Sequence, residues 1–142
     1  MKRSDITFQK LLKILDLAIS EGFLTYNAAK DGINHSKGYL FSNENSSFLK
    51  SFEKKDLAID LGTGGGLPGL VLATFTDCLW LLVDRSARRC AFLKKAISDL
   101  DLNEKVEVIE CSAEELSLGD YRGKAKRCFY WQIGRASCRE RV

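Results

Sequence analysis

Apolar residues recur along the chain with a helical period at first and as short unbroken runs later. From residue 6 to residue 20 their spacing predicts an amphipathic helix that ends at Gly22. Residues 23–37 are rich in Asn, Gly, Lys and Ser, a composition typical of a loop. The Leu and Phe residues between 40 and 52 favour a second helix, which a cluster of Asn and Ser residues interrupts.

From residue 57 onward, short apolar runs alternate with helical stretches. The runs at 57–60, 79–84 and 106–110 predict strands, with a helix from Pro68 between the first two and another over 88–100. This order forms two βαβ units, so we predict an α/β fold with a right-handed, doubly wound parallel sheet. After the third strand, we expect room for at most one more.

The first predicted strand runs into a glycine-rich loop. Asp60 to Gly69 reads Asp-Leu-Gly-Thr-Gly-Gly-Gly-Leu-Pro-Gly, in which Gly64, Gly66 and Gly69 have the G-x-G-x-x-G spacing of nucleotide-binding loops. Glycine permits a positive φ and a close approach of the backbone to a ligand. The Asp60 carboxylate suits the cationic sulfonium of S-adenosylmethionine and would repel a pyrophosphate. The alternative is a turn that only packs a strand on a helix.

Two further segments belong to the same predicted sheet edge. Asp84 ends the second strand, 22 residues beyond Gly62, where an acidic residue often binds ribose hydroxyls. It could instead cap the following helix. Residues 112–115 follow the third strand, where an adenine ring would rest against the sheet edge. Glu114 could equally be a helix-capping acid.

Charge is distributed unevenly along the chain. The 22 Lys and Arg against 19 Asp and Glu residues give a net charge of +3, and the basic excess lies after residue 120. Ile133 to Val142 resembles the conceptual translation of a short-read sequencing adapter, and we expect it to stand outside the natural protein. The remaining net charge then gives no argument for nucleic acid.

The composition also bears on location and on metals. No run approaches the roughly 18 apolar residues that cross a bilayer, and no apolar signal core follows the first residues, so we expect a cytoplasmic protein with no membrane partner. The five cysteines lack metal-ligand spacing, which predicts reduced thiols and no metal site. A group of basic residues around the second strand either follows RNA phosphates or forms a solvated helix face: Arg85, Arg88, Arg89, Lys94 and Lys95.

Three segments together resemble one family. They are residues 60–73, residues 82–93 (Leu-Val-Asp-Arg-Ser-Ala-Arg-Arg-Cys-Ala-Phe-Leu) and residues 111–116 (Cys-Ser-Ala-Glu-Glu-Leu). They resemble the small-subunit rRNA guanine-N7 methyltransferases, also called glucose-inhibited division protein B. The likeness is clear over residues 55–123, and Gly-Leu-Pro-Gly is its most specific part.

The resemblance implies a function and a set of contacts. It implies methyl transfer from S-adenosylmethionine to guanine N7 in 16S rRNA of the 30S subunit, in the loop around nucleotide 527, with no catalytic side chain. The family's cofactor contacts fall on Gly62, Leu67, Ala113 and Glu114, with Asp84 at the ribose. With the loop residues, the expected cofactor site comprises Asp60, Gly62, Gly64, Gly66, Leu67, Asp84, Ala113 and Glu114.

This chain also departs from the family pattern. Ser112 stands where the family often has Arg. Residues 126–131 (Lys-Arg-Cys-Phe-Tyr-Trp) differ from the family's sequence at its fourth strand, and no counterpart of the cofactor-binding Arg that follows that strand can be named. We therefore divide the chain into a helical segment (1–54), a cofactor-binding half (55–125) and a tail (126–142), and expect the chain as written to fold poorly and lack activity.

Three other functions remain compatible with the sequence. A methyltransferase acting on a small molecule or a protein would have the same cofactor half, because that half does not determine the acceptor. An NAD(P)-binding oxidoreductase shares the glycine spacing. A non-catalytic nucleotide-binding module would share the α/β fold alone.

Overall fold

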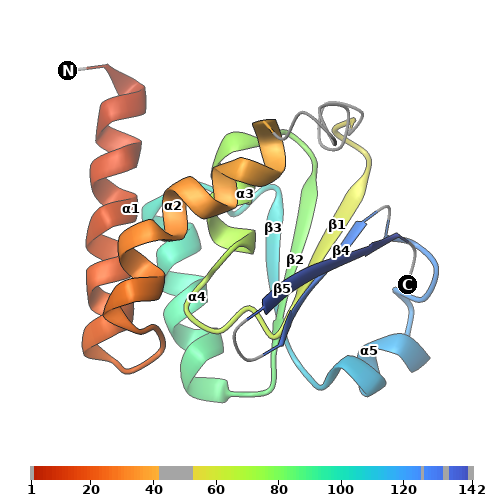
Figure 1. Cartoon of the computed structure of the whole chain (residues 1–142). Coiled ribbons are helices and arrows are strands. Elements are labelled where there is room, and N and C mark those ends of the chain that lie inside the picture. The colour runs from red at the N-terminus through yellow and green to blue at the C-terminus, as the bar shows by residue number, and fades with distance from the viewer. Residues whose placement is uncertain (1, 42–52, 126, 133–134, 141–142) are drawn as a thin grey trace.

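The computed structural model describes residues 2–41, 53–125, 127–132 and 135–140. Figure 1 shows a twisted sheet with helices on both faces. In chain order the elements are α1 (Arg3–Ser20), α2 (Tyr26–Phe41), β1 (Leu57–Leu61), α3 (Gly69–Phe75), β2 (Leu79–Asp84), α4 (Ala87–Asp99), β3 (Val106–Glu110), α5 (Ala113–Leu118), β4 (Arg127–Gln132) and β5 (Arg135–Glu140).

The sheet has the strand order β3-β2-β1-β4-β5. After β1, the chain adds β2 and β3 on one side of β1, and it then crosses over to add β4 and β5 on the other side. The first four strands in this order are parallel, and β5 pairs antiparallel with β4. Figure 1 shows α1 to α4 to the left of the sheet and α5 at its lower right. The predicted doubly wound α/β fold is therefore confirmed. Two strands follow β3 rather than one at most, and β5 falls within the segment that we attributed to an adapter.

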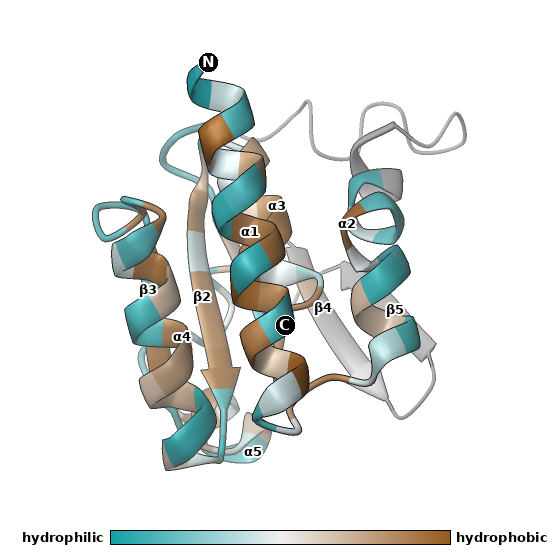
Figure 2. Cartoon of the chain, turned by 90° about the vertical axis from the view of Figure 1, so that its left-hand side faces the viewer, coloured by the Kyte–Doolittle hydropathy of each residue, from teal (hydrophilic) through white to brown (hydrophobic). Residues whose placement is uncertain are grey.

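The inner strand β2 is covered on both faces. Trp80 and Leu82 belong to the cluster under α1 to α4, whereas Leu81 and Val83 belong to the cluster under α5. In Figure 2 this strand is brown, and thus hydrophobic, along most of its length. A strand buried on both faces needs a continuous apolar run, which is why its limits could be predicted from the sequence.

The predicted first helix is confirmed as α1, and its end follows a standard pattern. Gly22 has φ +77°, the Phe23 N–H donates to the Ala18 carbonyl (2.8 Å) and the Gly22 N–H donates to that of Ile19 (3.0 Å). These two bonds form a Schellman motif, in which a left-handed glycine stops the helix and turns the chain. The chain consequently makes a fixed corner before α2.

The loop expected over residues 23–37 is wrong, because most of that stretch belongs to α2. Ala29, Ile33 and Ser36 recur on one buried side of this helix. Burial of that side against the rest of the molecule outweighs the weak helix propensity of its Asn and Gly residues. The part of the expected second helix that falls on residues 42–52 lies outside the described residues.

A buried carboxylate joins β1 to α3. Asp60 is fully buried, and its Oδ2 accepts a hydrogen bond of 2.8 Å from the N–H of Gly69, the first residue of α3. A Cβ atom at Gly69 would overlap with Asp60 and Leu82, so only glycine allows this approach. Burial raises the pKa of Asp60 from its ordinary 3.8 to about 7, although the Thr63 hydroxyl and the Gly69 N–H both lower it. The carboxylate therefore carries a desolvation penalty when charged.

This penalty predicts a specific pH dependence of stability. Between its unfolded pKa of 3.8 and its folded pKa of about 7, Asp60 holds a proton in the folded chain that the unfolded chain has released. Raising the pH through this window therefore favours unfolding. The test compares the free energy of unfolding of Asp60→Asn with that of wild type at two pH values. This difference should favour the variant by about 1 to 3 kcal/mol more at pH 8 than at pH 5.

Urea melts at the two pH values measure this difference. Asp16→Asn, which alters an exposed carboxylate on α1, is the control and should show a much smaller change. An equal effect of Asp60→Asn at both pH values would contradict the prediction.

Candidate functional site

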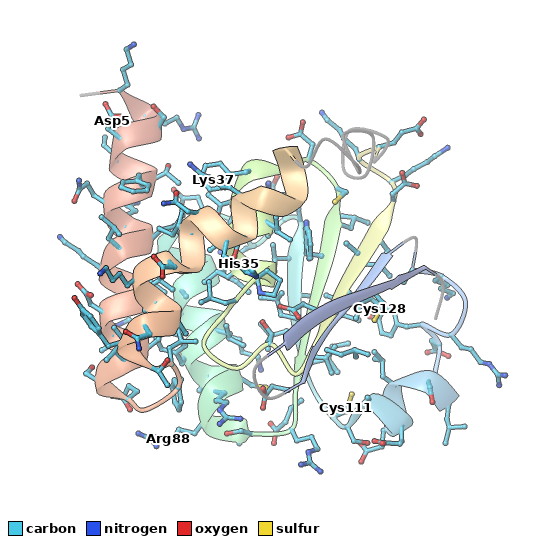
Figure 3. All side chains as sticks on the ribbon, in the orientation of Figure 1. Asp5, His35, Lys37, Arg88, Cys111 and Cys128 are labelled. Carbon is cyan, nitrogen blue, oxygen red and sulfur yellow. The ribbon has the colours of Figure 1, made fainter. Side chains whose placement is uncertain are left out.

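The carboxyl ends of three neighbouring strands form one edge of the sheet. Gly62 follows β1 and donates from its N–H to the Val83 carbonyl (2.8 Å), and Cys111 follows β3 and donates to the Asp84 carbonyl (3.1 Å). In Figure 3, Arg88, just after β2, and Cys111 lie at the lower end of the molecule, opposite Asp5. The segments predicted to form the site therefore meet at this edge.

The loop from Gly62 to Pro68 has a backbone that only glycine adopts readily. Gly62, Gly64 and Gly66 have φ values of +68°, +57° and +99°. Other residues in this left-handed region lose about 1 to 2 kcal/mol. The Gly66 N–H donates to the Thr63 carbonyl (2.9 Å), which closes the turn. The conformational reason given for the glycines is thus confirmed at three positions, and contact with a ligand stays a prediction.

Asp84 holds both the glycine loop and the start of α4. Its Oδ2 accepts from the Gly64 N–H (3.0 Å), its Oδ1 accepts from the Ser86 N–H (2.9 Å), and Arg89 lies 3.7 Å from Oδ1. The capping alternative is therefore present in the structure. It does not displace the ribose prediction, because a carboxylate oxygen can accept more than one hydrogen bond.

The Asp60 side chain does not lie on the surface of the loop where a ligand would bind. The structure places it behind the loop, 0% exposed, so direct contact with a cationic group as predicted is not available in this geometry. The reason is the alternation of side chains along β1, which directs Asp60 to the face that α3 covers. Its Oδ1 and the Thr63 Oγ1 are buried, and neither has a hydrogen-bond partner of normal geometry among the described residues.

The position of Asp60 changes the argument against a pyrophosphate. With a pKa of about 7, its carboxylate is a weaker source of repulsion than a fully charged one. However, Asp60 accepts the hydrogen bond of the first N–H of α3. In a Rossmann dinucleotide site this N–H donates to the pyrophosphate instead. Pro68 just before it has no N–H to offer. The start of α3 is therefore already used by the protein itself.

At the third strand, Ser112 and not Glu114 caps the short helix α5. The Ser112 Oγ accepts from the Glu115 N–H (3.1 Å), while Glu114 lies exposed in the first turn. Glu114 as the capping residue is therefore wrong. Its side chain and the half-buried Ala113 remain at the sheet edge, and their contact with an adenine ring stays a prediction.

Burial divides the predicted site residues into two groups. Gly62 and Glu114 are exposed, and Gly64 and Ala113 are half-buried. The other four are buried: Asp60, Gly66, Leu67 and Asp84.

Arg88 and Arg89 also have partners within the protein. The Arg88 guanidinium pairs with the Glu21 carboxylate (2.5 Å) and lies 5.1 Å from the Phe23 ring centroid. Arg89 lies 6.0 Å from the same ring. Neither predicted alternative, phosphate contacts or a solvated helix face, included these contacts within the chain.

Several residues around the loop were not predicted from the sequence. Leu24 packs against Gly65, Gly32 lies against Leu67, and Thr63 is buried beneath the turn. No local pattern marks the first two, because each contact joins segments far apart in the chain. Thr63 lies inside the loop motif, but it was not singled out because the glycine spacing does not specify the residue at its position.

The described residues contain neither a cluster of metal ligands nor a membrane-spanning helix. No group of three or more His, Cys, Asp and Glu residues lies close enough together to hold a metal ion. None of the helices in these ranges is long and apolar enough to cross a membrane.

Known proteins show where this arrangement recurs. The family model for rRNA small subunit methyltransferase G matches residues 40–129. Ribosomal RNA small subunit methyltransferase G from Salinispora tropica is 48% identical over 62 residues, which are 43% of this chain and 26% of the relative. The protein of that name from Mannheimia succiniciproducens is 34% identical over 85 residues, 59% of this chain and 40% of the relative. The matched stretch therefore spans less than half of either relative.

Among solved structures, one from Klebsiella pneumoniae that is provisionally assigned as an O-methyltransferase superposes with a TM-score of 0.60. It shares 15% identity and is covered over 50% of its length by 81% of this chain, so the likeness concerns the fold alone. The fold is thus that of a Rossmann-like methyltransferase. Since the family model covers more than half of the sequence, including the glycine loop and Asp84, the chain belongs to the rRNA small subunit methyltransferase G family.

Proposed function

We propose that the chain provides the S-adenosylmethionine site of an enzyme that methylates guanine N7 in 16S rRNA. The observation that carries this proposal is the loop of three left-handed glycines at the end of β1, held by Asp84 from the end of β2. Family membership supports the same function. Since the relatives are longer than the matched stretch, the proposal concerns the activity of a protein that includes this site.

The residues at the sheet edge fit this cofactor. Gly62 and Gly64 leave backbone accessible where a side chain would occupy ligand space. Asp84 is an acceptor for ribose hydroxyls, and Ala113 and Glu114 line the place of the adenine ring. When bound, S-adenosylmethionine supplies a methyl group on a sulfonium leaving group.

The proposed acceptor atom explains why no catalytic base is assigned. Guanine N7 has a lone pair and carries no proton, so no side chain has to remove one. The protein then needs to orient the acceptor and exclude competing geometries, which are the main contributions of positioning to catalysis. His35, which lies on α2 in Figure 3, is accordingly given no catalytic role.

The acceptor is inferred from relatives named ribosomal RNA small subunit methyltransferase G. We propose that this chain also acts on the 30S subunit, in the loop around nucleotide 527, and therefore in the cytoplasm. A small-molecule or protein acceptor is the alternative, because the cofactor half alone does not distinguish acceptors. An NAD-dependent reaction is disfavoured by the use of the first α3 N–H by Asp60.

Two measurements test this function. Isothermal titration of this chain, extended by the C-terminal remainder of the Mannheimia succiniciproducens relative, should detect S-adenosylhomocysteine and not NAD. The same chimera should transfer labelled methyl groups to 30S subunits. Binding of NAD alone would refute the cofactor proposal, and methylation of added proteins but not of 30S subunits would refute the acceptor.

The glycine loop gives a direct prediction. Gly62→Val should weaken S-adenosylhomocysteine binding by about tenfold or more, since it fills the ligand side of the loop and strains the turn. Gly123→Val is the matched control: Gly123 also has a positive φ (+75°), and a Cβ there meets no atom within 4 Å. Titration should show normal binding by the control. Equal affinities for the two folded variants would exclude the loop from the cofactor site.

Asp84 gives a second prediction. Asp84→Ala should weaken S-adenosylhomocysteine binding by about 1 to 3 kcal/mol, because ribose hydroxyls lose their acceptor. An analogue that lacks the ribose hydroxyls should bind wild type weakly as well, and it should lose little further affinity with Asp84→Ala. If the two losses simply add, Asp84 acts on the fold of the loop and not on the ribose.

A further inference from the structure

The N-terminal helices reach the glycine loop directly, although the family model begins only at residue 40. At the corner between α1 and α2, the Leu24 side chain lies where a Cβ on Gly65 would be. The Phe23 carbonyl oxygen lies 4.0 Å from the position of a Cβ on Gly64. Phe23 and Leu24, in the corner formed by residues 21–24, thus lie against the loop.

A second contact comes from α2. A Cβ on Gly32 would lie 2.6 Å from the Leu67 Cδ1, closer than real Cβ atoms approach their neighbours. Gly32 is buried within the helix and has no positive φ, so close packing and not backbone conformation accounts for it. The helix therefore presses its backbone against Leu67, a residue of the expected cofactor site.

The same corner packs against α4. Glu21 pairs with Arg88, the Phe23 and Phe92 rings meet edge to face at 5.3 Å, and both arginines of α4 lie over Phe23. Arg89 in turn lies 3.7 Å from Asp84, whose other oxygen binds the Gly64 N–H. The corner consequently supports the loop both by direct packing and through Asp84.

We infer that the α1–α2 corner and Gly32 are positioning elements for the cofactor loop, so that residues before position 40 set the affinity for the cofactor. This inference rests on the proposed function. Packing of Leu24 on Gly65 and of α2 on Leu67 keeps the loop in its binding geometry in the ligand-free chain. If only a fraction of the chains has the loop in its binding geometry, the apparent Kd equals the intrinsic Kd divided by that fraction, so binding is weaker.

The test compares two leucines of the same segment. Leu24→Ala removes the contact with Gly65, whereas Leu11→Ala removes a fully buried side chain of α1 and serves as the stability control. Leu24→Ala should raise the Kd for S-adenosylhomocysteine by about fivefold to twentyfold, and Leu11→Ala by less than about twofold despite a larger loss of stability in urea. Leu24→Met should restore binding, because it refills the space.

Gly32→Ala provides an independent arm with the opposite effect on the helix. Alanine raises helix propensity by about 1 kcal/mol, yet its Cβ displaces Leu67. The variant should therefore keep or gain stability in urea while its Kd for S-adenosylhomocysteine rises. If binding is unchanged in both Leu24→Ala and Gly32→Ala, the positioning role is refuted.

Hydrogen exchange in the ligand-free chain separates this inference from the proposed function. The N–H groups of Gly64 and Gly66 bond to Asp84 and Thr63, and they should exchange faster in Leu24→Ala than in Leu11→Ala. Wild type that fails to bind S-adenosylhomocysteine would refute the proposed function, and this exchange difference would still test the positioning. Equal exchange in both variants would overturn it.

Discussion

Two buried carboxylates accept backbone N–H groups of the loop between β1 and α3, and the geometry of the site depends on this. Asp60 binds the first N–H of α3, and Asp84 binds that of Gly64. The loop turns away from the sheet within a few residues, so the N–H groups of Gly64 and Gly69 bond to side chains and not to strands. Three left-handed glycines make the turn possible, and the carboxylates give it fixed partners on two adjacent strands.

Most of the sheet could be predicted because its inner strands β1 and β2 are buried on both faces. The limits of β2 and β3 coincide with the predicted ranges, and β1 ends one residue later than predicted, at Leu61. Helix α2 could not be found in this way, since its composition resembles a loop and its helical state depends on packing against α1 and α3. β5 was not expected, because its backbone partner is β4 and no local pattern required a further strand.

The residues that form the site could be predicted better than the directions of their side chains. Glycine spacing and the strand-end acid identified the edge where the segments meet. The burial of Asp60 was also present in the sequence, since alternation along β1 places it on the face of Ala58 and opposite Ile59. By contrast, the packing of Leu24 on Gly65 joins two segments whose separate patterns contain no sign of each other.

The ion pair between Glu21 and Arg88 has a consequence for how the protein is made. Its partners are 67 positions apart, and the chain leaves the ribosome from its N-terminus. When α1 emerges, the helix that anchors its corner has not been synthesised, and β2, which supplies Asp84, follows the glycine loop. The support that α4 gives to the corner can form only after α4 has left the exit tunnel, so the nascent chain carries its most glycine-rich segment without that support for the time that this takes.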